Sequence, residues 1–257
     1  MLERDEVIEL QRRGLEALVR ILAAGADGSQ LLTFPGVTAV AAAAAARRSF
    51  VNSVVYRSVE ELAAAIDPLA VAYRSRGIEA WTVWTPEDDE VAKRILATAG
   101  HELDASPAAM ALELAELPDA DLDALDWDAD AAPGEVAELN DLAYGWGPSG
   151  GFTDAFTRNA DPSLRLHRAR IDGSAACVAG TIDVGSDCVL VMVATHPDHR
   201  GKGLARRLCH AALTAARDRG LATSTLQSTK LGRPVYERLG YRSYGAIEMW
   251  ERRKPGA

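Results

Sequence analysis

Hydrophobic residues along the chain form short strand-like runs, and a longer helix-like pattern follows most of them. In the first half, an apolar run over 53–56 precedes a helical pattern that Gly77 ends, and a run over 81–84 precedes one that Gly100 ends. An extended segment over 110–112 follows. This order predicts a unit in which strands and helices alternate.

The second half of the chain repeats the same order. A run over 189–193 leads into a helical pattern that Gly220 ends, and a run over 224–227 leads into one that Gly240 ends, before an extended segment over 244–250. The matching order, with a glycine closing each helix, favours a duplicated unit. The ordinary alternation of strands and helices in any α/β protein is the alternative explanation.

The segments outside the two repeats complete the domain prediction. Residues 3–23 have the pattern of an amphipathic helix. Residues 118–133 are rich in aspartate, and such a run of like charge is typical of a solvated linker. For its far end, around 125–127, the alternative is the first strand of the second unit. We expect an α/β protein with a first domain over 1–117, an acidic linker and the start of the second domain over 118–133, and a second domain over 134–257.

The composition excludes several classes of protein. Hydrophobic residues make up 48% of the 257 residues, enough for sizeable cores, and the net charge of −9 argues against general nucleic-acid binding. Because no apolar stretch has membrane-spanning length and the charged N-terminus is unlike a secretory signal, we expect a cytoplasmic protein with no membrane partner. Three cysteines without CxxC spacing predict buried thiols, with neither disulfides nor a metal site.

A glycine-rich turn is the most specific feature of the chain. Residues 200–205, Arg-Gly-Lys-Gly-Leu-Ala, join the strand over 189–193 to the next helix. The first N–H groups of a helix have no intrahelical partner, the helix dipole is positive there, and glycines let an anion approach closely. Arg200 and Lys202 add positive charge, so the turn predicts a phosphate site. Its spacing fits neither a dinucleotide-binding turn nor a P-loop.

Two segments together resemble a known family. The sequence over 193–205, Val-Ala-Thr-His-Pro-Asp-His-Arg-Gly-Lys-Gly-Leu-Ala, and that over 232–241, Gly-Arg-Pro-Val-Tyr-Glu-Arg-Leu-Gly-Tyr, are similar to the GCN5-related N-acetyltransferase (GNAT) superfamily. The resemblance covers about 125–253. It implies a mixed, mostly antiparallel central sheet flanked by helices, here in two tandem copies. It also implies an acetyltransferase that needs no metal and moves an acetyl group from acetyl-coenzyme A to an amine by direct attack.

The resemblance also implies how the cofactor is held. Strand backbone would pair with the pantetheine arm, N–H groups of 201–205 would bind the pyrophosphate, and an N–H near Val193 would stabilise the oxyanion. Many members carry an asparagine where Ser228 stands, and we expect the serine to substitute for it. The residues expected to contact acetyl-CoA are Val193, Ala194, Thr195, Arg200, Gly201, Lys202, Gly203, Leu204, Ala205 and Ser228.

The resemblance further points to a general acid. Tyr236 stands where the family often places a tyrosine that protonates the departing thiolate, and an aromatic residue on a buried helix face is the alternative reading. The general base stays open among Asp183, Asp187, His196 and a water relay. We interpret Asp187 as a turn residue and His196 as a surface residue.

The acceptor is expected over the helix end and glycine-rich loop from Tyr144 to Phe152, with Tyr144 and Trp146 as wall residues. An ordinary flexible connection is the alternative there. We expect a small-molecule or peptide amine, and the sequence leaves its identity, and an acyl group longer than acetyl, open. The alternative function is a non-catalytic acyl-CoA-binding sensor or interaction module.

The first repeat lacks these features. Aligning the glycines at the helix ends places residues 57–61, Arg-Ser-Val-Glu-Glu, against the glycine-rich turn, so the glycines are gone and two carboxylates appear. That alignment matches Gly77 with Gly220, and matching Gly100 with Gly240 instead places Leu96 against Tyr236. We therefore expect the N-terminal domain to be a degenerate acetyltransferase-like copy that has neither the cofactor site nor the acid.

Overall fold

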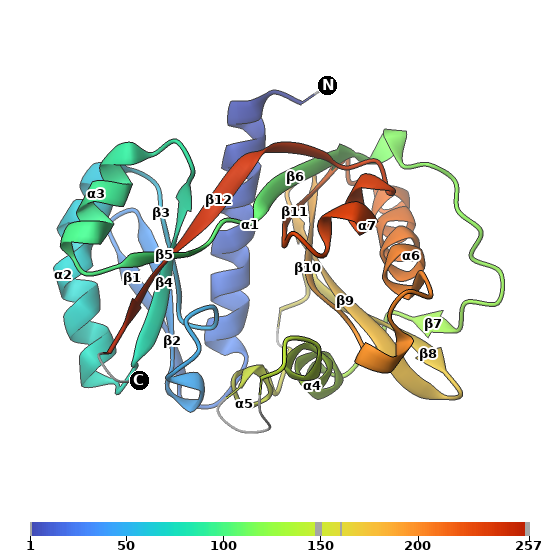
Figure 1. Cartoon of the computed structure of the whole chain (residues 1–257), viewed down its shortest axis with the longest axis horizontal. Helices are drawn as coiled ribbons and strands as arrows, with labels where there is room; N and C mark the ends of the chain where they lie inside the picture. The colour runs from blue at the N-terminus through green and yellow to red at the C-terminus, as the bar shows by residue number, and fades with distance from the viewer. Residues whose placement is uncertain (1, 147–150, 160, 255–257) are drawn as a thin grey trace. The chain divides into compact units, whose positions relative to one another are not determined.

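The computed structural model describes residues 2–146, 151–159 and 161–254 (Figure 1). The chain forms two compact units, and each is made of three separate stretches of sequence. Unit 1 comprises residues 1–14, 108–148 and 161–245, and unit 2 comprises residues 15–107, 149–160 and 246–257. No helix in the described ranges is long and apolar enough to cross a membrane.

Unit 2 contains a mixed sheet with helices packed against it (Figure 1). Its elements are the second half of α1 (Arg4–Ala24), β1 (Ser29–Phe34), β2 (Val37–Ala42), η1 (Ala43–Ala45), β3 (Ser53–Tyr56), α2 (Val59–Ser75), β4 (Ala80–Pro86), α3 (Glu90–Thr98), β5 (Glu102–Ala105), α5 (Phe152–Ala155) and most of β12 (Arg242–Arg253). The strand order is β1-β2-β3-β4-β12, and β5 pairs with β12 as well. β3 and β4 are parallel, and the other pairs are antiparallel.

Unit 1 also contains a mixed sheet with helices packed against it. Its elements are the first half of α1, β6 (Ala108–Glu113), η2 (Leu114–Glu116), β7 (Trp127–Asp128), α4 (Pro133–Ala143), β8 (Leu164–Ile171), β9 (Ser174–Val184), β10 (Asp187–Thr195), η3 (Pro197–His199), α6 (Leu204–Asp218), β11 (Thr223–Ser228), α7 (Arg233–Glu237) and the start of β12. The strand order is β6-β11-β10-β9-β8-β7. β10 and β11 are parallel and the other pairs antiparallel, so the predicted mixed, mostly antiparallel fold flanked by helices is confirmed.

The core of unit 1 is built on both faces of β10. Cys188 and Leu190 are buried in the cluster beneath α6, whereas Val189 faces α1. A Cβ at Gly14 would lie 2.8 Å from a methyl carbon of Val189, so the glycine permits the close approach of α1 to the sheet. All three cysteines are buried, which confirms the prediction of buried thiols.

Helix α1 also links two strands of unit 1 through one buried side chain. Gln11 is fully buried, and its amide nitrogen donates to the carbonyl oxygens of Met110 in β6 and Leu226 in β11, at 3.0 Å each. Because a buried amide is costly unless its hydrogen bonds are made, these contacts fix α1 against the strands.

The far end of the acidic segment belongs to the unit 1 sheet. Trp127 and Asp128 form β7, and Asp128 pairs with Arg168 at 3.2 Å and with Arg170, both on β8. Asp126 pairs with Arg170 at 3.1 Å. For these two aspartates the solvated-linker interpretation does not hold, and the alternative of a strand around 125–127 agrees with β7. Arginines of a strand distant in sequence pair with both carboxylates.

Each sheet includes a strand from the other half of the chain. β6 follows the first repeat in sequence but pairs with β11 along its whole length, from Thr223↔Glu113 to Ser228↔Ala108. The end of β12 follows the second repeat but pairs with β4 in unit 2. The compact units thus differ in extent from the three predicted segments.

This exchange of strands predicts how fragments will behave. The fragment 118–257 lacks β6, which exposes the edge of β11 and removes the buried side chains of Met110, Leu112 and Leu114 from the core. We expect it to aggregate or to unfold without a cooperative transition, and the matched fragment 106–257 to be more stable in thermal unfolding. Equal cooperative transitions in the two fragments would contradict this role of β6.

Candidate functional site

The parallel strands of unit 1 are paired at one end only. β10 and β11 are in register from Asp187↔Thr223 to Val189↔Thr225, and no further pairing between them occurs among the described residues. β10 nevertheless continues to Thr195. From Leu190 onward, the side of β10 that faced β11 is therefore free to pair with an extended ligand.

A bulge interrupts β10 within this open stretch. Val191 pairs with Gly180 of β9 and Ala194 pairs with Val178, so Met192 and Val193 together oppose one residue. Met192 has a φ of 54°, a left-handed conformation that costs a residue with a side chain about 1–2 kcal/mol. Such local strain concentrates at functional sites.

The glycine-rich turn continues directly from the open strand. Gly201 and Gly203 have φ angles of 75° and 74°, and Gly203 is the N-cap of α6. A Cβ at either glycine would meet nothing within 4 Å, so the space beside the turn is open. In the part of the chain that the structure describes, the N–H groups of 201–205 have no acceptor. Unpaired donors, a helix N-terminus and open space fit a diphosphate group.

The two basic side chains of the turn differ in their contacts. Arg200 donates to the carbonyl oxygen of Ala143, at the end of α4, over 2.6 Å. The amine of Lys202 lies 3.1 Å from Nδ1 of His199 and is exposed. Arg200 thus connects the turn to the helix end that precedes Tyr144, and Lys202 stays accessible to an anion.

Tyr236 lies on α7 and packs partly buried against the core beneath α6. A Cβ on Gly232 would lie 3.2 Å from the tyrosine ring, so the glycine leaves room for it. Burial raises the pKa of Tyr236 well above its usual value, which keeps the hydroxyl protonated. This hydroxyl makes no hydrogen bond with any described residue, and it is available as a donor.

Ser228 ends β11 below the same helix. It is buried, and its hydroxyl donates to the carbonyl oxygen of Thr229 at 2.9 Å. A Cβ on Gly232 would lie 3.4 Å from this hydroxyl oxygen. The structure therefore brings Ser228 close to α7, and its contact with a cofactor stays a prediction.

The two expected wall residues of the acceptor site contact each other. The rings of Tyr144 and Trp146 are stacked, with centroids 5.4 Å apart and planes inclined by 25°. Tyr144 is the C-cap of α4 and is 52% exposed. Residues 147–150 of the predicted loop lie outside the described residues.

The candidates for the general base are all engaged elsewhere. Asp183 accepts from Arg165 at 2.6 Å and from Arg219 at 2.8 Å. His196 accepts through Nδ1 from the N–H of Asp198 at 3.2 Å. Asp183 is therefore held by two arginines, whereas His196 makes one contact within its own turn.

Asp187 is a correction to the sequence interpretation. It is the first residue of β10 and is buried, where a turn residue was expected. Its two oxygens accept from the hydroxyls of Thr223 and Thr225, at 2.7 and 2.6 Å, and burial raises the pKa of its carboxyl. The turn interpretation was wrong because both threonines belong to β11, and the sequence around Asp187 does not show that this strand lies beside it. Asp187 lies at the paired end of β10 and β11, away from the open stretch.

Two residues of the site had no sequence signal. Met192 adopts a left-handed conformation that a methionine does not predict, and its carbonyl oxygen accepts from the amide of Asn140 at 3.1 Å. Asn140 lies on α4 and is buried. Nothing in the local pattern of an amphipathic helix distinguishes such an asparagine from a surface residue.

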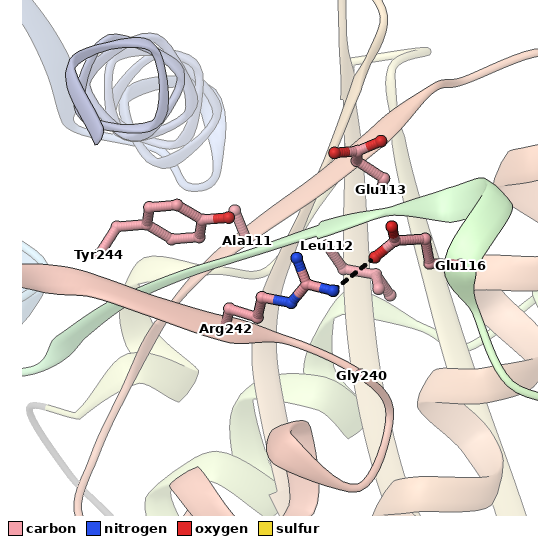
Figure 2. Close-up of a pocket in the computed structure, with 7 residues that line it drawn as sticks. All are labelled: Ala111, Leu112, Glu113, Glu116, Gly240, Arg242 and Tyr244. Carbon is pink, nitrogen blue, oxygen red and sulfur yellow. Dashed lines mark hydrogen bonds and ion pairs between the residues drawn. The ribbon is translucent and has the colours of Figure 1, made fainter. Parts of the chain in front are cut away.

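A hollow in unit 1 is lined by other residues than these. It is a small depression lined by β6, its following turn and the start of β12, and Figure 2 shows Arg242 reaching Glu116 across it at 3.1 Å. None of the predicted site residues lines it. No group of three or more metal-ligating side chains occurs in the described ranges.

Unit 2 also contains one pair of parallel strands followed by a helix. β3 and β4 pair in parallel at Ser53↔Thr82 and Val54↔Val83. The following helix α2 is capped by a side chain at its N-terminus, because the hydroxyl of Ser58 accepts from the N–H of Glu61. Tyr56, at the end of β3, donates to Asp89 at 2.8 Å.

Comparisons with known proteins show which domain and which folds the chain is similar to. Residues 153–249 match the model of the acetyltransferase (GNAT) domain, so this part of the chain is similar to that domain. The fold resembles a GCN5-related N-acetyltransferase from Kribbella flavida, with a TM-score of 0.66, 17% identity and 96% of each chain covered. No curated protein matches the chain.

Two further solved structures have the same fold. A GCN5-related N-acetyltransferase from Sphaerobacter thermophilus aligns with a TM-score of 0.57 and 16% identity, covering 94% of this chain and 93% of the other. A tandem GNAT protein from the clavulanic acid biosynthesis pathway aligns with a TM-score of 0.54 and 13% identity, covering 100% of this chain and 98% of the other. The likeness in fold therefore extends over both units.

The glycine-rich turn allows a matched test. Gly203→Ala places a methyl group in the open space and strains the left-handed N-cap, so we expect the affinity for coenzyme A to fall about tenfold or more. Gly220→Ala is the matched control. Gly220 lies beyond the other end of α6 at a φ of 92°, so an alanine there is also strained, and its Cβ would also meet nothing within 4 Å. Titration calorimetry should show normal affinity for Gly220→Ala. Equal affinities for the two variants would rule out the turn as the binding site.

Proposed function

We propose that the chain is an acetyl-CoA-dependent N-acetyltransferase whose active site lies in unit 1. The observation that carries the proposal is that β10 loses its pairing with β11 after Val189 and leads into a turn with unpaired N–H groups over 201–205. The open strand edge suits the amide-containing pantetheine arm, and the turn suits the pyrophosphate. Ala194, Thr195, Leu204 and Ala205 contribute backbone to this continuous surface.

The acetyl group is then expected at the bulge in β10. The N–H of Val193 would donate to the thioester oxygen and stabilise the oxyanion that forms when the amine attacks. The amine nitrogen forms a bond to the carbonyl carbon, the carbon–sulfur bond breaks, and the thiolate takes a proton from Tyr236. The amine's own proton leaves to solvent or to a base that the described residues do not identify.

Tyr144 and Trp146 support an acceptor site beside the turn. Their stacked rings stand at the end of α4, and Arg200 connects this helix end to the turn. An exposed aromatic pair offers a flat surface to an amine-bearing small molecule or peptide.

Unit 2 is proposed to be a degenerate copy that binds no cofactor. The hydroxyl of Ser58 takes up one of the N–H donors at the start of α2. The carboxylate of Glu61 lies so close to Gly36 that a Cβ there would be 1.8 Å from it, and this fixed negative charge opposes a pyrophosphate. Leu96 is fully buried at the position that corresponds to Tyr236. The repeated strand order supports a tandem origin of the two units.

The proposed activity is tested by free thiol release from acetyl-CoA in the presence of a panel of primary amines. We expect release that depends on the amine and is absent without it. Binding of acetyl-CoA with no amine-dependent release across small amines, polyamines, amino acids and peptides would favour the non-catalytic sensor.

The role of Tyr236 is tested by Tyr236→Phe. Loss of the general acid should lower kcat by ~10²-fold while the KM for acetyl-CoA changes little, because the ring still packs under α6. Tyr241→Phe is the matched control. It removes a buried hydroxyl that bonds Ser224 at 2.6 Å, and should cost about 1 kcal/mol of stability without affecting kcat. Unchanged kcat in Tyr236→Phe would remove its proposed role.

A further inference from the structure

The strained backbone of β10 requires a stabilising contact. Met192 is held at a φ of 54° although a methionine is more stable in the right-handed or extended regions. Because Met192 and Val193 together oppose one residue of β9, the regular ladder does not continue through them. Without another contact to hold the bulge, Met192 would return to an extended conformation and the strain would be relieved.

Asn140 supplies such a contact from outside the sheet. It is 6% exposed and lies on α4, which packs against β9 and β10. Its amide nitrogen donates to the carbonyl oxygen of Val136 at 2.8 Å and to that of Met192 at 3.1 Å. Both N–H groups of the amide are therefore used, one within its own helix and one on the bulge.

The contact with Met192 also determines the direction of a second group. The carbonyl of Met192 and the N–H of Val193 belong to one peptide unit, which is planar and trans, so they point in opposite directions. A donor that holds the carbonyl toward α4 consequently directs the Val193 N–H away from α4. That N–H is the group proposed above to bind the thioester oxygen.

We propose that Asn140 is a positioning residue that orients the Val193 N–H for the acetyl group of the cofactor. The inference rests on the proposed function and adds a residue from a different element to it. Asn140 touches neither cofactor nor acceptor in this account. It acts by holding the Met192–Val193 peptide in the bulged conformation.

The test compares the affinities of each variant for acetyl-CoA and for coenzyme A, which lacks the acetyl carbonyl. The ratio of the two affinities isolates the contact to that carbonyl, and no acceptor is needed. We expect the wild-type protein to bind acetyl-CoA more tightly. Asn140→Leu should reduce this preference by roughly two- to tenfold, the range of one hydrogen bond. With an accepted amine, kcat should fall by at least tenfold, with a smaller change in KM.

Two further variants separate positioning from packing. Val136→Ala removes a fully buried side chain from the same helix but keeps the backbone carbonyl, so it should lower the melting temperature and retain the preference. Asn140→Leu combined with Met192→Gly should recover the preference, because glycine adopts the left-handed conformation without strain. If Asn140→Leu does not fold, Asn140→Ser takes its place.

Three results would overturn the inference. The first is an unchanged preference for acetyl-CoA over coenzyme A in the Asn140 variant. The second is an equal loss of this preference in Val136→Ala, and the third is its failure to return in the double variant. Failure of the wild-type protein to bind either ligand would instead overturn the proposed function, and the two failures are thus distinguishable.

Discussion

The site depends on the limited pairing of two parallel strands. β10 and β11 share only the register from Asp187 to Val189, and the buried carboxylate of Asp187 joins them there by accepting from Thr223 and Thr225. On the other side of each strand the ladder continues, with β9 beside β10 and β6 beside β11. The strands are thus fixed at one end and free at the other. The backbone proposed to bind the pantetheine arm lies in the stretch of β10 that this arrangement leaves unpaired by β11.

Strain and open space follow from the same arrangement. Beyond the paired end, β10 contains the bulge at Met192 and then the left-handed glycines of the turn. These conformations are unfavourable for a regular strand or helix, and packing elsewhere offsets them. Gln11 holds α1 against two strands, and Asn140 holds α4 against the bulge. The rigid parts of unit 1 therefore support a segment whose own conformation favours binding over stability.

Much of the fold could be predicted from the sequence, because local patterns determine it. The turn at Gly203 was recognisable since its left-handed conformation favours glycine, and the helix ends at Gly220 and Gly240 were recognisable for the same reason. The conformation of Met192 could not be recognised from the sequence, because its φ depends on a contact with a helix about fifty residues earlier. The extent of the units was also hidden, since pairing of β6 with β11 joins strands that no local pattern connects.

We propose that one acetyl-CoA binds per chain, between β10 and β11. A crystal structure of the protein with acetyl-CoA would decide this. We expect the pantetheine arm beside Leu190–Thr195, the pyrophosphate at the N–H groups of 201–205, the thioester oxygen at the Val193 N–H, and no ligand beside β3 and β4. A ligand bound at the start of α2, or in the depression lined by Arg242 and Glu116, would contradict it.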